Sequence, residues 1–152
     1  MKIKNAKRKH YLAPVDPTDQ AKVPEADEFL WIAKGIKESA PENDEETDDS
    51  GYFDGDGTPD EIVTSKKRGR SFEGHRHYGD AAQDYVASKE DETGDDLLVW
   101  YKEVTADGKI QKLGLARLSE IEIGDGEATE LETISFKVVW ISKPVVSDVV
   151  SG

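Results

Sequence analysis

The side chains in this sequence that could bind a metal ion are few. His75 and His77 stand two residues apart, so an extended strand would place both imidazoles on one face. Such a pair can bind zinc, but beyond Glu73 on the same face no further ligand accompanies it. We therefore expect polar strand residues near an interface here, and no metal site.

The acidic run from Asp54 to Glu61 superficially resembles a calcium-binding loop. An EF-hand requires oxygen ligands at the first, third and fifth positions, glycine at the sixth and glutamate at the twelfth. In this run glycine comes too early and Pro59 interrupts the pattern. The sequence therefore favours an acidic turn over a calcium site.

Catalytic patterns are also missing from the sequence. The chain contains no cysteine, which excludes disulfides, thiolate metal sites and cysteine nucleophiles. It contains no Gly-x-Ser-x-Gly turn, phosphate-binding loop or dinucleotide fingerprint. Two carboxylates for glycoside hydrolysis could be drawn from so acidic a chain, but no cleft is predicted to hold them. We expect a protein that is not an enzyme and that carries no cofactor or metal.

The net charge restricts the partners of this protein. The 152 residues include 20 lysines and arginines against 33 aspartates and glutamates, for a net charge of −13. Such a chain repels nucleic acid, whose phosphates need a surplus of cations. The length predicts a single domain over residues 1–152. Neither a signal peptide nor a run of roughly 20 apolar residues that could span a membrane is present.

The charges are unevenly distributed. The segment Glu38–Glu61 contains no lysine or arginine, and it has two prolines and three glycines. Because it cannot bury much apolar surface, we expect an extended acidic loop. Basic residues gather instead in the first segment and at Lys66–Arg70. Opposite charges in separate blocks are a plausible basis for docking between copies of the chain.

The hydrophobic pattern before Gly94 predicts strands and one helix. Strands are expected over Lys2–Val15 (a strand or arm), Phe29–Ile36 and Ser71–Tyr78. Asp80 and Gln83 have the spacing of a capping box at a helix N-terminus. Ala82, Tyr85, Val86 and Lys89 then fall on one face at helical spacing, and Gly94 marks the latest end of this helix.

After the helix the pattern is that of a three-stranded meander. Strands are expected over Leu97–Val104, Lys109–Ile123 (bent near Ser119) and Thr129–Ile141, with turns at Asp107-Gly108 and Asp125-Gly126. The last strand carries apolar residues on both faces, which predicts that both faces are covered. Residues 144–152 are expected to form a C-terminal arm. The predicted fold is mainly β: an antiparallel β-sandwich or barrel flanked by one α-helix, with a long inter-subunit loop.

Several passages resemble one known family across nearly the whole chain. They are Met1–Tyr11, Gly51–Gly57, Phe72–Gly74 with Asp84–Lys89, His77–Gln83 and Gly124–Gly126. In these passages, and in its order of elements, the sequence resembles the major tail-tube proteins of long-tailed bacteriophages with non-contractile tails that infect Gram-positive hosts.

This resemblance implies a structural role. Members of the family form rings of six that stack into a hollow tube, through which DNA passes during ejection without being bound. It implies synthesis in the host cytoplasm and residence in the virion tail, with no membrane contact. The partners it implies are further copies of the chain, a tape-measure protein, a tail terminator and a distal tail protein. The long loop would contact the neighbouring ring.

Within that interpretation, residues receive three expected roles. Ring-stacking loop candidates are Glu42, Asp44, Glu45, Glu46, Asp48, Asp49, Tyr52 and Phe53. Basic docking candidates are Lys7, Arg8, Lys9, Lys66, Lys67 and Arg68. Candidates for exposed strand positions that line an acidic, phosphate-repelling lumen are Glu103, Glu120, Glu122, Glu130 and Glu132.

Two alternatives from other classes stay open. The first is a β-sandwich module that binds a host surface or carbohydrate, with calcium as one option. The second is a phage tail connector such as a terminator.

Overall fold

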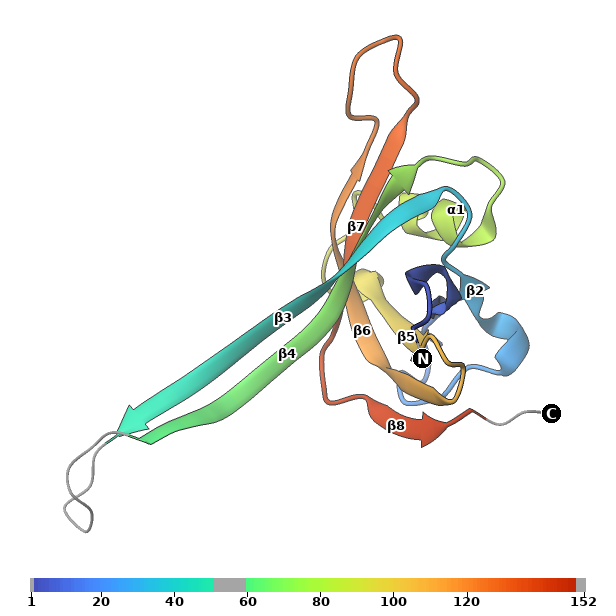
Figure 1. Cartoon of the computed structure of the whole chain (residues 1–152). Helices are drawn as coiled ribbons and strands as arrows, with labels where there is room; N and C mark the ends of the chain where they lie inside the picture. Colours follow the sequence, from blue (N-terminus) through green and yellow to red (C-terminus); the bar gives the residue numbers. More distant parts are fainter. Residues whose placement is uncertain (1, 51–59, 150–152) are drawn as a thin grey trace.

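The protein is built around a curled antiparallel sheet (Figure 1). The structure is a computed structural model that describes residues 2–50 and 60–149. The strands are β1 Lys9–Pro14, β2 Leu30–Trp31, β3 Ile36–Ser50, β4 Asp60–His75, β5 Leu98–Val104, β6 Ile110–Ile123, β7 Thr133–Trp140 and β8 Val145–Asp148. Their order across the sheet is β2-β1-β5-β6-β7-β4-β3, and β8 pairs with β6.

One α-helix, α1 (Ala81–Ser88), is present in the described residues, together with the short 3-10 turns η1 (Asn5–Lys7), η2 (Ala26–Glu28) and η3 (Gly94–Leu97). The predicted fold class, a mainly β fold with an antiparallel sheet and one helix, is confirmed. As predicted, the Asp80 side chain caps α1 by accepting a hydrogen bond from the backbone N–H of Gln83. The Gln83 side chain does not return the bond. It donates instead to the carbonyls of Lys34 and His75, and so ties the helix to both strands at the body end of the β3–β4 pair.

The core lies between α1 and the concave side of the sheet. Val86 of α1 is fully buried and belongs to the same hydrophobic cluster as the strand residues Phe72, Tyr101 and Phe136. The aromatic rings contact one another directly: Phe72 and Phe136 have ring centroids 5.2 Å apart, and those of Tyr101 and Trp140 are 5.0 Å apart. Such contacts add to the free energy gained by burying the rings.

The meander from β5 to β7 follows the sequence pattern. β5 and β6 form a hairpin whose turn includes Gly108 in the left-handed region, at φ +76°. The bend predicted near Ser119 is present as a register shift between Ser119 and Glu122 in the β6–β7 ladder. Glu120 at the bulge has φ +48°, an uncommon conformation for a residue other than glycine.

β7 is shorter than the predicted strand Thr129–Ile141. Ile134, Phe136, Val138 and Trp140 are buried, as the alternation indicates. The other face is not covered as expected, because Thr133, Ser135, Lys137 and Val139 are only partly buried. Leu131 and Ile141 flank the strand and remain 71% and 47% exposed. Within the described residues, the sheet therefore has a core on one face only in this part.

The prediction of an extended acidic loop over residues 38–61 is wrong for the part of this segment that the structure describes. Residues up to Ser50 continue β3, and residues from Asp60 belong to β4. The two strands pair along their length and project from the body as a long two-stranded arm (Figure 1). Backbone pairing with β4 satisfies the polar groups of β3 without a hydrophobic core, so its acidic composition does not prevent a strand.

Three other boundaries differ from the prediction. Phe29–Ile36 is interrupted by a turn at Gly35, at φ +80°, so only Leu30–Trp31 pairs with β1. The strand predicted over Ser71–Tyr78 begins earlier and ends at His75. Part of the predicted C-terminal arm, Val145–Asp148, forms β8 by pairing with the first residues of β6. No helix among the described residues is long and apolar enough to cross a membrane.

Candidate assembly surface

The arm formed by β3 and β4 has two electrostatically different halves. Near the body, the register places Asp44 opposite Lys67 and Glu45 opposite Lys66. Farther out no cation stands opposite β3 in the described register: Asp48 faces Ile62 and Asp49 faces Glu61. Acidic residues directly opposite each other disfavour pairing. The outer half of the arm is therefore suited to a cationic partner.

A cationic groove lies at the base of this arm. The groove has a volume of about 870 Å³ and combines basic side chains with an apolar floor. Its lining residues are Lys66, Lys67, Arg68, Arg117, Ser119, Val139, Trp140, Ile141, Ser142, Lys143 and Pro144. A patch of five cations on a chain with a net charge of −13 is a strong local reversal of charge.

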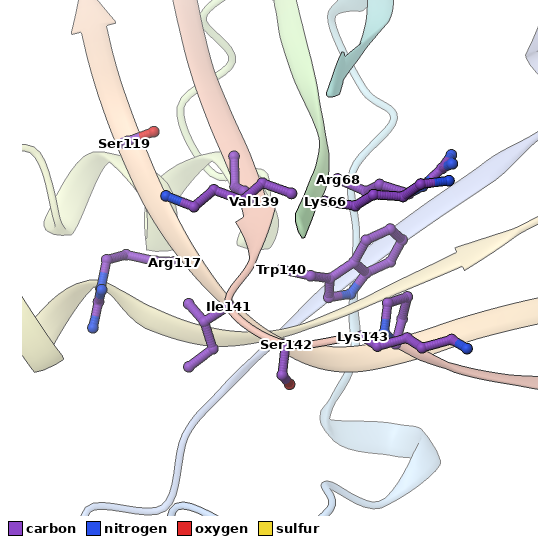
Figure 2. A pocket seen from close by; sticks show the side chains of 11 residues that line it. Lys66, Arg68, Arg117, Ser119, Val139, Trp140, Ile141, Ser142 and Lys143 are labelled. Carbon is purple, nitrogen blue, oxygen red and sulfur yellow. The ribbon is translucent and has the colours of Figure 1, made fainter. Parts of the chain in front are cut away.

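Figure 2 shows how the groove is assembled from three segments. Lys66 and Arg68, two residues apart on β4, extend in the same direction past the indole of Trp140. Lys143, in the connection between β7 and β8, lies on the other side of this indole. The indole itself is fixed, because its Nε1 donates a hydrogen bond of 3.1 Å to the carbonyl of Tyr101. A rigid apolar floor between cations suits an anionic segment with some apolar character.

Apart from Lys66, the cations of the groove are weakly neutralised within the described part of the chain. Arg117 lies 3.7 Å from Asp95, and both side chains are largely exposed, so the pair is weak. Lys67, Arg68 and Lys143 form no ion pair with another described side chain. The groove therefore keeps positive charge that a second molecule can reach.

The expected lumen carboxylates divide into three groups. Glu120 and Glu122 are exposed on β6, and Glu120 forms an ion pair of 2.6 Å with Lys137, which also lies 3.7 Å from Glu42. These residues border a polar sheet face that also carries the exposed Glu73.

Glu130 and Glu132 were predicted as strand positions, but they lie in the connection before β7. Glu132 accepts a hydrogen bond of 2.6 Å from the Tyr78 hydroxyl, so it bridges this connection to the segment before α1. β7 begins later than predicted because the chain first passes through a turn at Gly124 and Gly126, which both have positive φ.

Glu103 was expected to be exposed, and this expectation is wrong. It is 4% exposed and accepts hydrogen bonds from Arg8 and Arg70, the latter at 3.1 Å from Nε. Burial alone would raise the pKa of the Glu103 carboxyl, but the positive charges of Arg70 and Arg8 outweigh it and lower that pKa. The register placed Glu103 on the core side of β5, where a carboxylate is tolerated only because two arginines meet it.

The same cluster gives Arg8 an ion-pair partner within the subunit, unlike the other docking candidates of the N-terminal segment. Arg8 forms an ion pair with Glu103, whereas Lys7 and Lys9 are exposed, and Lys9 lies over the Trp31 ring at 5.6 Å. His10 joins the cluster through a contact of 3.0 Å between Nδ1 and the Tyr101 hydroxyl. The N-terminal segment is therefore partly held by the buried cluster of Arg8, Glu103 and Arg70, called the arginine cluster below.

The remaining candidates are the acidic residues expected in the loop and the histidine pair, and the strand boundaries show where they lie. The acidic residues Asp44, Glu45, Glu46, Asp48 and Asp49 belong to β3, while Tyr52, Phe53 and the run from Asp54 to Pro59 lie outside the described residues. His75 ends β4, and His77 follows it in the connection to α1, so the two are not on one strand face.

Four relevant residues were not among the predicted docking or lumen residues. Arg117 and Lys143 complete the cationic groove, Arg70 completes the arginine cluster, and Glu73 joins the polar face. Only Glu73 had a usable signal, since it alternates with the buried Phe72 along β4. The others depend on which distant strands lie together.

Known proteins match this chain in structure but not in sequence. No protein-family model and no curated protein matches the sequence. A solved structure of the tail of an empty gene transfer agent particle, refined with C6 symmetry, matches with a TM-score of 0.69 at 12% identity, over 98% of this chain and 100% of the other.

Two further structures extend this comparison. The SPP1 tail tube matches with a TM-score of 0.66 at 12% identity, over 99% of this chain and 81% of the other. The tube-terminating cap of an anti-feeding prophage matches with a TM-score of 0.56 at 10% identity, over 98% and 93%. At these identities the likeness establishes the fold: the chain folds like subunits found in tail tubes and their caps.

Proposed function

We propose that this protein is the structural subunit of a bacteriophage tail tube. The observation that carries the proposal is the match over 98% of the chain to a protein in a particle tail of C6 symmetry. In this proposal six copies form a ring, and rings stack into a tube within the virion after synthesis in the host cytoplasm. The subunit acts by shape and contact, not by catalysis.

Electron microscopy of the purified full-length chain tests this function. Negatively stained samples should contain rings of uniform width and, at higher protein concentration, hollow tubes built from them. A monomer at every concentration would contradict the proposal, and a monomer that binds glycan or calcium would favour a host-surface binding module. Because a tube-terminating cap shares the fold, a tail terminator is the second candidate, and rings that never stack would favour it.

Stacking between rings is assigned to the two surfaces at opposite ends of the arm. The outer half of the arm carries Asp48, Asp49 and Glu61 without cations opposite them, while the cationic groove at its base has cations to spare. In a stack of identical subunits, the acidic half of one arm can reach the groove of a copy in the next ring. Such a head-to-tail contact repeats without closing, which is the symmetry that a tube needs.

Charge reversal at the groove tests this contact. The triple substitution of Lys66, Lys67 and Arg68 by glutamate should leave rings intact and shorten or abolish tubes. The matched control reverses Lys2, Lys4 and Lys109, which are exposed and lie outside the groove. Tubes of normal length from the groove variant would exclude the groove as the docking surface.

The polar sheet face is assigned to the lumen. It carries Glu73, Glu120 and Glu122, whose carboxylates would repel the phosphates of DNA in transit. Because the chain has no cysteine, single-cysteine variants can map this face. In assembled tubes, Glu122→Cys should react with a small maleimide but not with one on a large polymer that cannot enter the tube. Equal reaction with both reagents would place Glu122 outside the tube.

The other expected partners follow from the same proposal. A tape-measure protein would occupy the lumen during assembly, a terminator would cap one end, and a distal tail protein would close the other. Tubes formed by the purified chain alone would have no fixed length if a tape-measure protein sets it. The comparison of tube-length distributions with and without co-expressed tail proteins tests this point.

A further inference from the structure

The arginine cluster holds more positive than negative charge. Arg8 contacts the Oε1 atom of Glu103 through both Nε and Nη2, and Nε of Arg70 contacts the same oxygen. The two arginine side chains are only 25% and 16% exposed, and that of Glu103 is 5% exposed. Two guanidinium groups therefore share one carboxylate in a largely buried place.

The neighbouring titratable groups do not supply the missing negative charge. His10 is neutral at pH 7, because burial lowers its pKa to about 4. The Tyr101 hydroxyl stays protonated, because burial raises its pKa well above the usual value. Among the described residues, no second carboxylate forms an ion pair with Arg8 or Arg70. One positive charge therefore remains unmatched, and burying such a charge is costly.

Both arginines also border a cavity of about 720 Å³. The cavity separates the N-terminal segment from the first part of β3, and Trp31, Lys37 and Ser39 share its lining. Glu103 does not line it, so this carboxylate meets the arginines from behind. Glu38 is a lining carboxylate, but it is exposed and forms no ion pair with either arginine. The cavity therefore presents the unmatched charge to any anion that enters.

We propose that this arginine cavity binds a carboxylate between Arg8 and Arg70. A guanidinium has five N–H donors in a planar fork that matches a carboxylate, so two arginines that share Glu103 can still bind a second carboxylate. In the assembled protein the carboxylate comes from an acidic segment of a second copy. This choice of source rests on the proposed tube function, whereas the binding site itself does not.

Binding can be measured on the free chain, below the concentration at which it assembles. The probe is a blocked tetraglutamate peptide, with blocked tetraglutamine as its uncharged match. Trp31 lines the cavity and is 54% exposed, whereas Trp140 lies in the cationic groove, which tetraglutamate can also enter, so the part of the fluorescence change that Trp31→Phe removes reports on the cavity. Tetraglutamate should give a saturable change that weakens with added salt. Tetraglutamine should give none, and Trp31→Phe should remove the part of the change that comes from the cavity.

Three variants at the two arginines test the site. Arg8→Gln and Arg70→Gln should each weaken tetraglutamate binding at least tenfold, while Arg8→Lys, which keeps the charge but loses the fork, should be intermediate. Lys37→Gln, on the lining of the same cavity, is the matched control and should change affinity far less. Circular dichroism verifies that each variant is folded. If one arginine variant does not fold, the other variant and the wild-type titration decide the question.

The outcomes separate this proposal from that of the tube. An unchanged affinity in Arg8→Gln and Arg70→Gln, or no saturable binding by the wild type, overturns the cavity assignment even if the chain forms tubes. Saturable binding of inorganic phosphate without binding of tetraglutamate overturns the carboxylate assignment. In assembled tubes the response to tetraglutamate should be lost, because a neighbour fills the cavity. A response equal to that of the free chain would show that free anions, and not a second copy, are its ligands.

Discussion

Arg68 and Arg70 stand two residues apart on the same face of β4, yet they lie in opposite environments. Arg70 is covered by the N-terminal segment and β5, and it contacts the buried Glu103. Arg68 lies where the strand leaves the body, and it borders the open cationic groove. The same side chain thus has an ion-pair partner within the subunit at one position and none among the described side chains at the other. Burial, and not residue type, makes the difference.

The largest effect should come from removing the buried carboxylate. Glu103→Gln leaves Arg8 and Arg70 without a negative partner in a largely buried place. We expect a loss of about 3–5 kcal/mol in the free energy of unfolding, measured by urea denaturation. Glu122→Gln, on an exposed carboxylate of β6, is the control and should leave the midpoint almost unchanged. Equal midpoints for the two variants would mean that the arginine cluster does not stabilise the fold.

The second effect is a loss of stability in mild acid. His10 faces Glu103, Arg70, Arg8 and Tyr101, and burial lowers its pKa from 6.5 to about 4 in the folded chain. The unfolded chain therefore binds a proton more readily, so stability is complete above pH 6.5 and falls as the pH drops toward 4. The expected loss is about 3 kcal/mol.

Urea midpoints measured between pH 7.5 and 4.5 test this dependence. The wild type should lose stability over this range, and His10→Gln should flatten the part of the curve that the imidazole causes. Below this range the lowered pKa of Glu103 adds a loss in the same direction. A wild-type curve that stays level to pH 4.5 would mean that His10 is charged in the folded protein.

A smaller effect on stability is expected at the groove. Lys67→Gln with Arg68→Gln changes exposed side chains and places no acidic residue opposite Asp44, so the urea midpoint of the free chain should hardly move. Its effect should be on tube length, as the stacking proposal requires. A large fall in midpoint would instead show that these cations serve the subunit itself, and the contrast with Arg70 would disappear.

The smallest effect is expected at the polar face. Lys137 lies between Glu120 at 2.6 Å and Glu42 at 3.7 Å, and these side chains are exposed enough for solvent to screen the pairs. Lys137→Gln should change the urea midpoint slightly at low salt and not at all in 1 M NaCl. A change that persists in high salt would indicate packing of the lysine stem, and not charge, as the cause.

Much of the fold of the body was predicted from patterns of residues close together in the sequence. Asp80 and Gln83 predicted the start of α1, Asp107-Gly108 predicted the β5–β6 turn, and the bend at Ser119 is present. These features depend on residues close in sequence, whose preferences act over a few bonds. The prediction of an extended acidic loop was wrong for the described residues, because strand formation depends on a pairing partner and not on composition alone.

Less of the candidate assembly surface could be predicted from the sequence. Lys66, Lys67 and Arg68 were found because they are consecutive, but Arg117 and Lys143 join them only through the pairing of β6, β7 and β4. Glu103 was placed in solvent because its neighbours Lys102 and Val104 gave no sign that Arg8 and Arg70 meet it. A charge 95 residues away in the chain leaves no local pattern.

By itself, the sequence determined the mainly β character, the helix α1, the meander and the segregation of acidic from basic blocks, because propensities, turn residues and charge are properties of short segments. Only the tertiary structure decided which charges are buried together and which remain exposed. The sheet brings Arg8, Arg70 and Glu103 into one cluster and carries Arg68 past the edge of the body. Long-range strand pairing sets the environment of each charge, and that environment determines its role.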